Sequence, residues 1–239
     1  MKVINPKAYQ WSLTGAQWIT EAQTYYLVSK TGKFLVLQIA YSNLSWPAQV
    51  TCQLTARYFD PASGKPGRSW VHNLAASKMK ISPDKRSVQI KSMNIQHLDE
   101  ELHQFEIRLS FQEGDQVELD LSFIPLLEPF SVMDGNWYFG VNRRDGFINM
   151  KFIPFGKVAG FLSLDGIKEV FDGFGMNLHQ FQGIKPYLTA SKWNFVYFQE
   201  EESESVNENL ISAFMIQIKT PAAYDGVMYN IGSIFAGGK

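Results

Sequence analysis

The sequence predicts an all-β protein with an antiparallel β-barrel, and three observations carry this prediction. Polar and apolar residues alternate in many short stretches, most clearly over residues 105–111, as expected of strands with one buried face. Turn sequences rich in glycine, proline, asparagine and aspartate separate these stretches. Residues 1–125 sustain no helical period. The chain has 239 residues, 45% of them hydrophobic and 14% aromatic, which is enough to bury a sizeable core.

The first half of the chain is expected to hold about eight short strands joined by tight turns. The candidate strands span residues 17–28, 34–41, 50–59, 70–74, 88–95, 105–111 and 117–124. Residues 30–33 form a typical hairpin turn, and residues 34–41 are almost continuously apolar, which indicates a strand covered on both faces. This succession predicts an up-and-down barrel over residues 1–125.

Two prolines, Pro125 and Pro129, mark a predicted boundary between lobes, because proline cannot donate to a central strand ladder. Beyond it the pattern restarts, with strands expected at residues 136–141, 147–152, 158–164, 211–219 and 227–234. An acidic run at residues 200–205 is typical of an exposed loop. The predicted C-terminal lobe, residues 126–239, is expected to be shortened because its strand pattern stops abruptly.

Residues 171–199 break this rhythm and are predicted to form a loop that interrupts the strands. The segment carries three glycines, a histidine, a Gly-Ile-Lys-Pro turn and then an aromatic strand. A loop of this kind on a β-scaffold is a common place for a binding site. A simple corner, where the chain changes sheet, fits the same residues, and both interpretations stay open.

The motifs give no catalytic set, no metal site and no cofactor site. The four histidines lack ligand spacing, and no Cys-x-x-Cys, phosphate-binding loop, nucleophile elbow or dinucleotide fingerprint occurs. The single cysteine, Cys52, excludes an internal disulfide, and its strand phase predicts a small buried residue. The net charge of −1 gives no reason to expect nucleic acid as a partner. Residues 1–10 lack the apolar region of a signal peptide, and no membrane-spanning run is found, so a soluble intracellular protein is expected.

Aromatic residues recur at the alternate positions of the predicted strands, Tyr25 and Tyr41 among them. A small barrel either fills its interior with such side chains or leaves room for one apolar ligand. Both interpretations stay open on the pattern alone.

Two stretches of the chain together resemble the fungal survival factor 1 family. The first runs from Glu21 to Tyr26 and includes residues 34–43. The second has three parts, which are Gln-Gly-Ile-Lys-Pro-Tyr at residues 182–187, Ala-Ser-Lys-Trp-Asn-Phe at 190–195 and Phe-Gln at 198–199, followed by Thr220-Pro221 and Tyr224. The stretches lie in the expected order and cover most of the chain.

The resemblance implies two consecutive lipocalin-like antiparallel β-barrels, at residues 1–125 and 126–239. The family's second lobe continues past the point where Gly232 ends this pattern, so the second barrel is expected to be incomplete. The resemblance also implies a cytoplasmic carrier of a ceramide-like sphingolipid, linked to survival under oxidative stress. It further implies transient contact with endoplasmic reticulum and Golgi membranes.

The ligand-binding residues expected from this resemblance lie mainly in the segment singled out above. Four residues are predicted to shape the mouth of the pocket or to hold the head group: Gln182, Lys185, Trp193 and Asn194. Phe195, Tyr25 and Tyr41 are predicted to line it. Some lipocalin-like relatives are fungal enzymes that catalyse cycloadditions. An enzyme of the cycloaddition or isomerisation type, acting on a hydrophobic small molecule, is therefore the alternative. A third interpretation is a stress-linked interaction protein with a packed interior.

Overall fold

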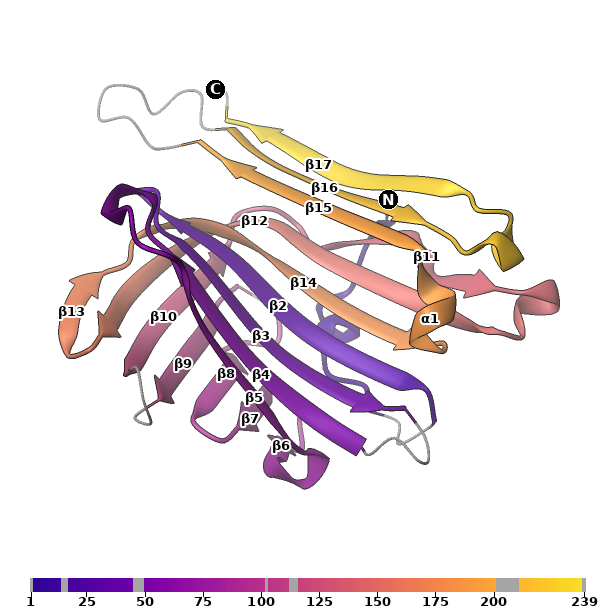
Figure 1. The fold of residues 1–239 in the computed structure, drawn as a ribbon, viewed down its shortest axis with the longest axis horizontal. Coiled ribbons are helices and arrows are strands. Elements are labelled where there is room, and N and C mark those ends of the chain that lie inside the picture. Colours follow the sequence, from indigo (N-terminus) through magenta and orange to yellow (C-terminus); the bar gives the residue numbers. More distant parts are fainter. Residues whose placement is uncertain are drawn as a thin grey trace.

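The computed structural model describes residues 2–13, 17–44, 50–101, 103–111, 116–200 and 211–237. Strands dominate these residues, and every strand pair among them is antiparallel (Figure 1). The predicted all-β fold is confirmed. In chain order the elements are β1 (Lys2–Val3), the 3-10 helix η1 (Pro6–Tyr9), β2 (Ile19–Ser29), β3 (Phe34–Asn43), β4 (Val50–Phe59), η2 (Pro61–Ser63), β5 (Arg68–Ala75), η3 (Ala76–Lys78), β6 (Met79–Ile81), β7 (Ser87–Ile90), β8 (Met93–His97), β9 (Phe105–Phe111), β10 (Val117–Pro125), β11 (Phe130–Phe139), η4 (Val141–Arg143), β12 (Gly146–Leu164), β13 (Ile167–Val170), β14 (Gly173–Gly183), the helix α1 (Pro186–Thr189), β15 (Lys192–Gln199), β16 (Ile211–Lys219), η5 (Ala222–Tyr224) and β17 (Met228–Ala236).

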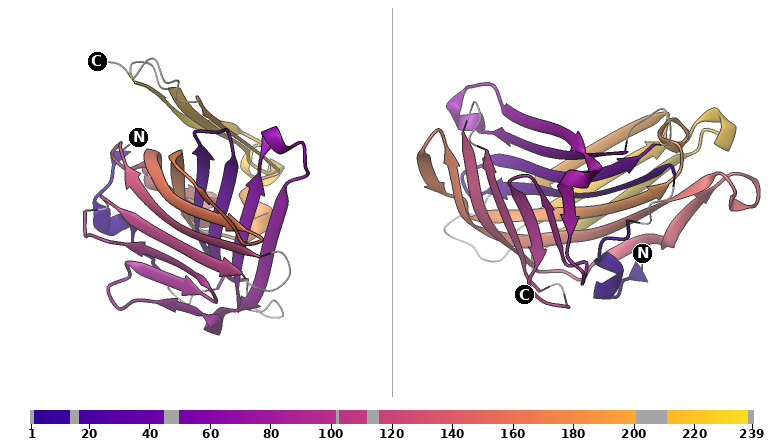
Figure 2. Two further views of the ribbon diagram at one scale, coloured as in Figure 1. Left: turned by 90° about the vertical axis from the view of Figure 1, so that its left-hand side faces the viewer. Right: turned by 90° about the horizontal axis from the view of Figure 1, so that it is seen from below.

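The larger sheet curls into a nearly closed barrel, which we call the first barrel (Figure 2). Its strands follow the order β5-β4-β3-β2-β14-β12-β10-β9-β8-β7-β6, so that β5 and β6 stand at the two ends of the path. The short η3 turn joins these two strands. Buried aliphatic and aromatic side chains from the surrounding strands form a core cluster in its interior.

Three neighbouring strands, β2, β14 and β12, form a wall with a buried face on each side. On β2, Tyr25 belongs to the core of the first barrel, while its neighbour Tyr26 packs against a second core cluster. Strand β12 changes its phase at a bulge between Ile153 and Gly156. Even-numbered residues up to Phe152 therefore face the second cluster, whereas Val158 and Leu162, beyond the bulge, face the first. Because side chains alternate between the two faces of each strand, these strands contribute residues to both core clusters.

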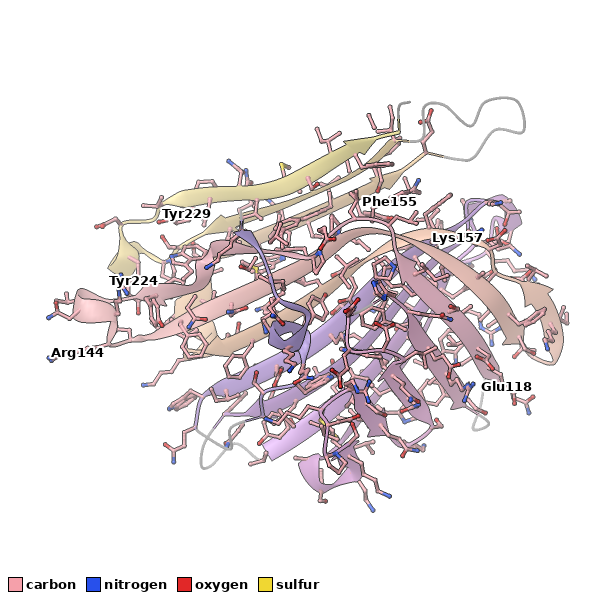
Figure 3. All side chains as sticks on the ribbon, turned by 180° about the vertical axis from the view of Figure 1, so that it is seen from behind. Glu118, Arg144, Phe155, Lys157, Tyr224 and Tyr229 are labelled. Carbon is pink, nitrogen blue, oxygen red and sulfur yellow. The ribbon has the colours of Figure 1, made fainter. Side chains whose placement is uncertain are left out.

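The second core cluster is closed by the separate sheet β15-β16-β17, which lies over this wall (Figure 1). We call this part the second lobe. Phe214 of β16 stacks on Phe152 with ring centroids 4.9 Å apart. Phe155, labelled in Figure 3, stacks on Phe235 of β17 at 4.6 Å. Burial of these rings joins the two sheets, because aromatic side chains contribute large apolar areas.

The structure corrects the predicted loop over residues 171–199, because residues 173–183 form the regular central strand β14. The glycines that suggested a loop reflect a close approach of neighbouring strands. A Cβ atom on Gly173 would lie 2.1 Å from the Val28 carbonyl oxygen, and one on Gly175 would lie 2.6 Å from that of Tyr26. Only glycine fits such positions. The Lys-Pro turn starts the short helix α1, and the aromatic strand forms β15.

Three other predicted strands differ from the structure. Residues 147–152 and 158–164 are parts of one strand of 19 residues, β12. Pro154 lies in the bulge between them, and strand pairing continues on the other side of this bulge. Residues 88–95 form two strands, because Lys91 adopts a φ of 51° and turns the chain. Cys52 is buried, as predicted, and its Sγ donates to the Ala75 carbonyl oxygen at 3.4 Å.

The division of the chain at residues 125 and 126 stays a prediction. Pro125 ends β10, and four residues link it to β11. Strands β12 and β14, which lie beyond this point, pair with strands of the first half and complete the first barrel. Across the described ranges, no helix is long and apolar enough to cross a membrane. Within the same ranges, no group of three or more His, Cys, Asp or Glu side chains could hold a metal ion.

Candidate functional site

A group of polar side chains lies inside the otherwise apolar first barrel. They come from the N-terminal segment (residues 2–13) and from strands β2, β8 and β14, and none is more than 2% exposed. We call this group the polar cluster, and its members are Tyr9, Trp11, Glu21, Gln23, Tyr25, His97, Asn177 and His179. Buried polar groups of this number in a barrel core require an explanation, because burial separates them from water.

Strand pairing brings much of this cluster together. Strand β2 alternates, so Glu21, Gln23 and Tyr25 share the face that points into the first barrel. In the ladder between β2 and β14, Gln23 is opposite His179 and Tyr25 is opposite Asn177. Residues directly opposite in an antiparallel pair lie on the same face. Two strands that are far apart in the sequence therefore present five polar side chains to one interior.

Glu21 and His179 hold the N-terminal segment against this wall. The Ser12 N–H donates to both carboxylate oxygens of Glu21, at 2.8 and 3.0 Å, and the Leu13 N–H donates to Oε2 at 2.9 Å. His179 Nε2 lies 2.9 Å from Glu21 Oε1, and its Nδ1–H donates to the Tyr9 carbonyl oxygen at 2.9 Å. The segment is thus fixed by side chains of β2 and β14.

His179 Nε2 and Glu21 Oε1 share one hydrogen bond, which links the two buried side chains. Burial lowers the pKa of His179 below its ordinary value, and the hydrogen bond from Glu21 acts in the opposite direction. Burial likewise lowers the pKa of Lys151, against the charge of Glu21. Both oxygens and both ring nitrogens of the pair have partners. The observed role of the pair is therefore to position the N-terminal segment.

A second tie joins the same segment to β14. The Tyr9 hydroxyl donates to Asn177 Oδ1, and Asn177 Nδ2 donates to the Thr24 carbonyl oxygen at 3.2 Å. Burial raises the pKa of Tyr9 and of Tyr25, so both phenols are neutral at physiological pH. The cluster therefore offers hydroxyl groups as donors or acceptors.

Four atoms of the polar cluster have no hydrogen-bond partner among the described residues. They are Trp11 Nε1, Gln23 Oε1, Tyr25 Oη and His97 Nδ1. Gln23 Nε2 lies 3.5 Å from His97 Nε2. The amide nitrogen of Gln23 can only donate, so His97 Nε2 is the acceptor and the His97 proton is on Nδ1. Burial, followed by the charge of His179, lowers the pKa of His97 to about 3, so this imidazole is neutral at pH 7.

Ring contacts, together with the contact between Gln23 and His97, join these four residues into one cluster. The His97 and Tyr25 rings lie 4.5 and 6.2 Å from Phe105, and Tyr9 lies 6.3 Å from His97. Tyr9 also contacts His179 at 5.2 Å, and His179 contacts Trp11 at 5.5 Å. The cluster is thus continuous, with apolar walls on the remaining sides.

Two of the predicted site residues face this interior. Tyr25 is a member of the polar cluster, and Tyr41 on β3 is opposite Glu21 in the β2–β3 ladder. The other five predicted residues lie elsewhere. Gln182 is buried in the second half of β14, where its Oε1 accepts from Gln180 Nε2 at 2.8 Å. Lys185 places its Nζ 5.3 Å from the centre of the Trp18 ring.

The remaining three predicted residues lie on β15, on two different faces. Phe195 packs into the second lobe, with its ring 4.4 Å from Tyr26. Asn194 points to the opposite face, where its Nδ2 donates to Gln217 Oε1 at 2.8 Å. Trp193 is 39% exposed. The structure therefore does not bring the seven predicted residues into one site.

The sequence prediction missed Glu21, Gln23 and His179 as site residues, although the pattern holds a signal for them. On β2, Glu21 and Gln23 occupy the alternate positions at which the strand buries its residues, and on β14, His179 ends a continuously buried run. A polar residue at a buried strand position is less usual than an apolar residue at an exposed position. That signal could have pointed to an internal polar site.

Comparisons with known proteins identify relatives of the whole chain. A model of the Svf1 family matches residues 1–239, which confirms the family resemblance predicted from the two motifs. The ceramide-binding protein svf1 of Emericella nidulans is 28% identical over 222 residues, which is 92% of this chain and 55% of that protein. The protein of the same name from Schizosaccharomyces pombe is 28% identical over 231 residues, 95% of this chain and 56% of that protein. The chain spans about half the length of these relatives.

Solved structures give the same fold at low sequence identity. A protein described as AttH from Nitrosomonas europaea has a TM-score of 0.64 and 14% identity, and the match covers 98% of this chain and 69% of that one. Kievitone hydratase from Nectria haematococca has a TM-score of 0.58 and 15% identity, covering 97% and 65% of the two chains. These likenesses establish the lipocalin-like architecture alone.

Proposed function

This chain belongs to the Svf1 family, and from that premise we propose that it binds and carries a ceramide-like lipid in its first barrel. The relatives named ceramide-binding proteins support the ligand class. A ceramide combines long hydrocarbon chains with a small uncharged head that carries an amide and hydroxyl groups. The proposed site must therefore be apolar over most of its surface and polar at one place.

One observation carries the proposal, and it is the amphipathic interior of the first barrel. Buried side chains such as Leu37, Phe105 and Phe123 provide apolar walls, while the polar cluster is confined to the part next to the N-terminal segment. A core built only for stability gains little from such polar groups, because each must recover the hydrogen bonds that it loses in leaving water. The arrangement matches a ligand with one polar end.

The test is transfer of a fluorescent ceramide between two liposome populations with the full chain present. We expect transfer to rise with protein concentration, and we expect ceramide to be recovered by extraction of the reisolated protein. Heat-denatured protein is the control for lipid exchange without a carrier. Transfer no faster than this control, together with no lipid in the extract, would reject the proposal.

Several expectations remain predictions alongside this proposal. They are the link to survival under oxidative stress, the cytoplasmic location, the transient contact with endoplasmic reticulum and Golgi membranes, and ligand contacts by the predicted residues of β14, α1 and β15. The cycloaddition or isomerisation alternative also stays a prediction.

A further inference from the structure

We infer that the four unpartnered atoms of the polar cluster bind the head group of an uncharged lipid that carries amide and hydroxyl groups. This inference rests on the proposed function and deepens it, because it assigns the site and the chemistry of the head group. The residues concerned are Trp11, Gln23, Tyr25 and His97, each at least 98% buried.

The burial of these atoms is the first step of the argument. A buried donor or acceptor without a partner is unfavourable, because it has left water and gained no hydrogen bond in return. Most buried polar side chains in folded proteins are satisfied. Four unpartnered atoms in one continuous cluster therefore mark a place where another molecule supplies the partners.

The donor and acceptor pattern gives the chemistry of that molecule. Trp11 Nε1 and His97 Nδ1 are donors, Gln23 Oε1 is an acceptor, and the Tyr25 hydroxyl can act as either. The complementary ligand carries at least two acceptor positions and one donor. An amide oxygen accepts two hydrogen bonds, and an amide N–H or a hydroxyl group donates one. An N-acyl head with neighbouring hydroxyls meets all four atoms.

The charge of the site selects against ionic head groups. None of the four atoms is charged at pH 7, and the Glu21–His179 pair is already fully hydrogen-bonded to the N-terminal segment and to itself. An ionic head placed there would lose its hydration without gaining a counter-ion of its own, because the nearby buried Lys151 already faces the charge of Glu21, and this loss is unfavourable. A neutral N-acyl lipid is therefore preferred over the free amine and over a phosphate ester.

The N-terminal segment provides the route of entry. Residues 6–13 are held to the barrel wall mainly by side chains, through Glu21, Asn177 and His179, and not by a strand ladder. Only Lys2 and Val3 of this segment pair with another strand, β11. Because Tyr9 and Trp11 sit inside the barrel, withdrawal of this segment opens the polar cluster from one side.

A pair of tyrosine variants on one strand tests the inference. Tyr25→Phe removes the unpartnered hydroxyl inside the first barrel, and Tyr26→Phe removes the same group from the opposite face of β2. The measurement is binding of a fluorescent short-chain ceramide to the full chain, with thermal unfolding of each ligand-free variant. For Tyr25→Phe we expect about 3- to 10-fold weaker binding and an unfolding temperature that is equal or higher. For Tyr26→Phe we expect unchanged binding.

A second comparison uses the wild-type chain with three ligands, which are ceramide, the free sphingoid amine and ceramide carrying a phosphate. We expect ceramide to bind most tightly. If wild-type protein binds ceramide but Tyr25→Phe and Tyr26→Phe bind it equally, the inference fails and the proposed function stands. Equal or tighter binding of the amine or the phosphate ester would also overturn the inference. No ceramide binding by the wild-type chain would overturn both. Gln23→Leu serves as a second variant, with the same weakened binding expected.

Discussion

Replacing Glu21 with alanine is expected to lower the free energy of unfolding by about 3–5 kcal/mol. The carboxylate accepts from the backbone of Ser12 and Leu13 and is hydrogen-bonded to His179, and it is fully buried. Its loss leaves two backbone N–H groups and one imidazole nitrogen without partners in an apolar interior. Urea denaturation followed by circular dichroism gives the change in unfolding free energy.

The matched control for this variant is Asp120→Ala, which removes an exposed carboxylate that lies 3.4 Å from Arg108. No measurable change is expected there, because exposed ion pairs are weakened by solvent. Glu21→Gln, which keeps one acceptor oxygen, should lie between alanine and wild type and serves if Glu21→Ala does not fold. An unfolding midpoint of Glu21→Ala equal to that of Asp120→Ala would show that the carboxylate does not hold the N-terminal segment.

Acid is expected to destabilise the protein through His97. Its folded-state pKa is about 3, below the ordinary value of 6.5 for histidine, because burial disfavours the charged ring. Between these values the unfolded chain binds a proton that the folded chain excludes, so stability is full above pH 6.5 and falls as the pH approaches 3. The free energy of unfolding then falls by up to about 1.4 kcal/mol per pH unit for one such proton. Burial lowers the pKa of His179 as well, which adds to the loss in the same direction.

Urea midpoints measured between pH 7 and pH 4 check this expectation. The variant His97→Gln should show a shallower loss of stability, because it removes one of the excluded protons. His103→Gln is the control, since the His103 side chain is 73% exposed. Parallel pH profiles for wild type and His97→Gln would contradict a neutral, buried His97.

Local patterns were sufficient to predict most of the strands. The alternation of Phe105, Ile107 and Leu109 with polar neighbours corresponds to β9, and the run from Val50 onward corresponds to β4. The prediction failed where a local signal has two physical causes. Gly173 can mark a turn or a close strand neighbour, and only the presence of Val28 across the ladder decides between them. The residues next to Gly173 in the sequence do not reveal that neighbour.

The polar cluster could not be assembled from the sequence, because its contacts join distant residues. Glu21 and His179 are 158 positions apart, and Tyr9 and Asn177 are 168 apart. Each contact exists because β14 inserts between β2 and β12, a pairing that no local pattern specifies. The motif containing Trp193 and Asn194 identified the family, but strand alternation places Asn194 on the outer face of its sheet. The motif around Trp193 therefore lies outside the interior polar site, whereas the first family stretch contributes Glu21, Gln23 and Tyr25 to it.

Photo-crosslinking of a ceramide whose reactive group lies close to the head tests the central claim most directly. After irradiation with the full chain, proteolysis and mass spectrometry locate the modified residues. We expect modification of the N-terminal segment, of β2 around Gln23 and Tyr25, and of β8 near His97, with competition by unlabelled ceramide. Competed modification confined to β15–β17 would place the ligand in the second lobe or on its outer face, and would contradict a head-group site in the first barrel.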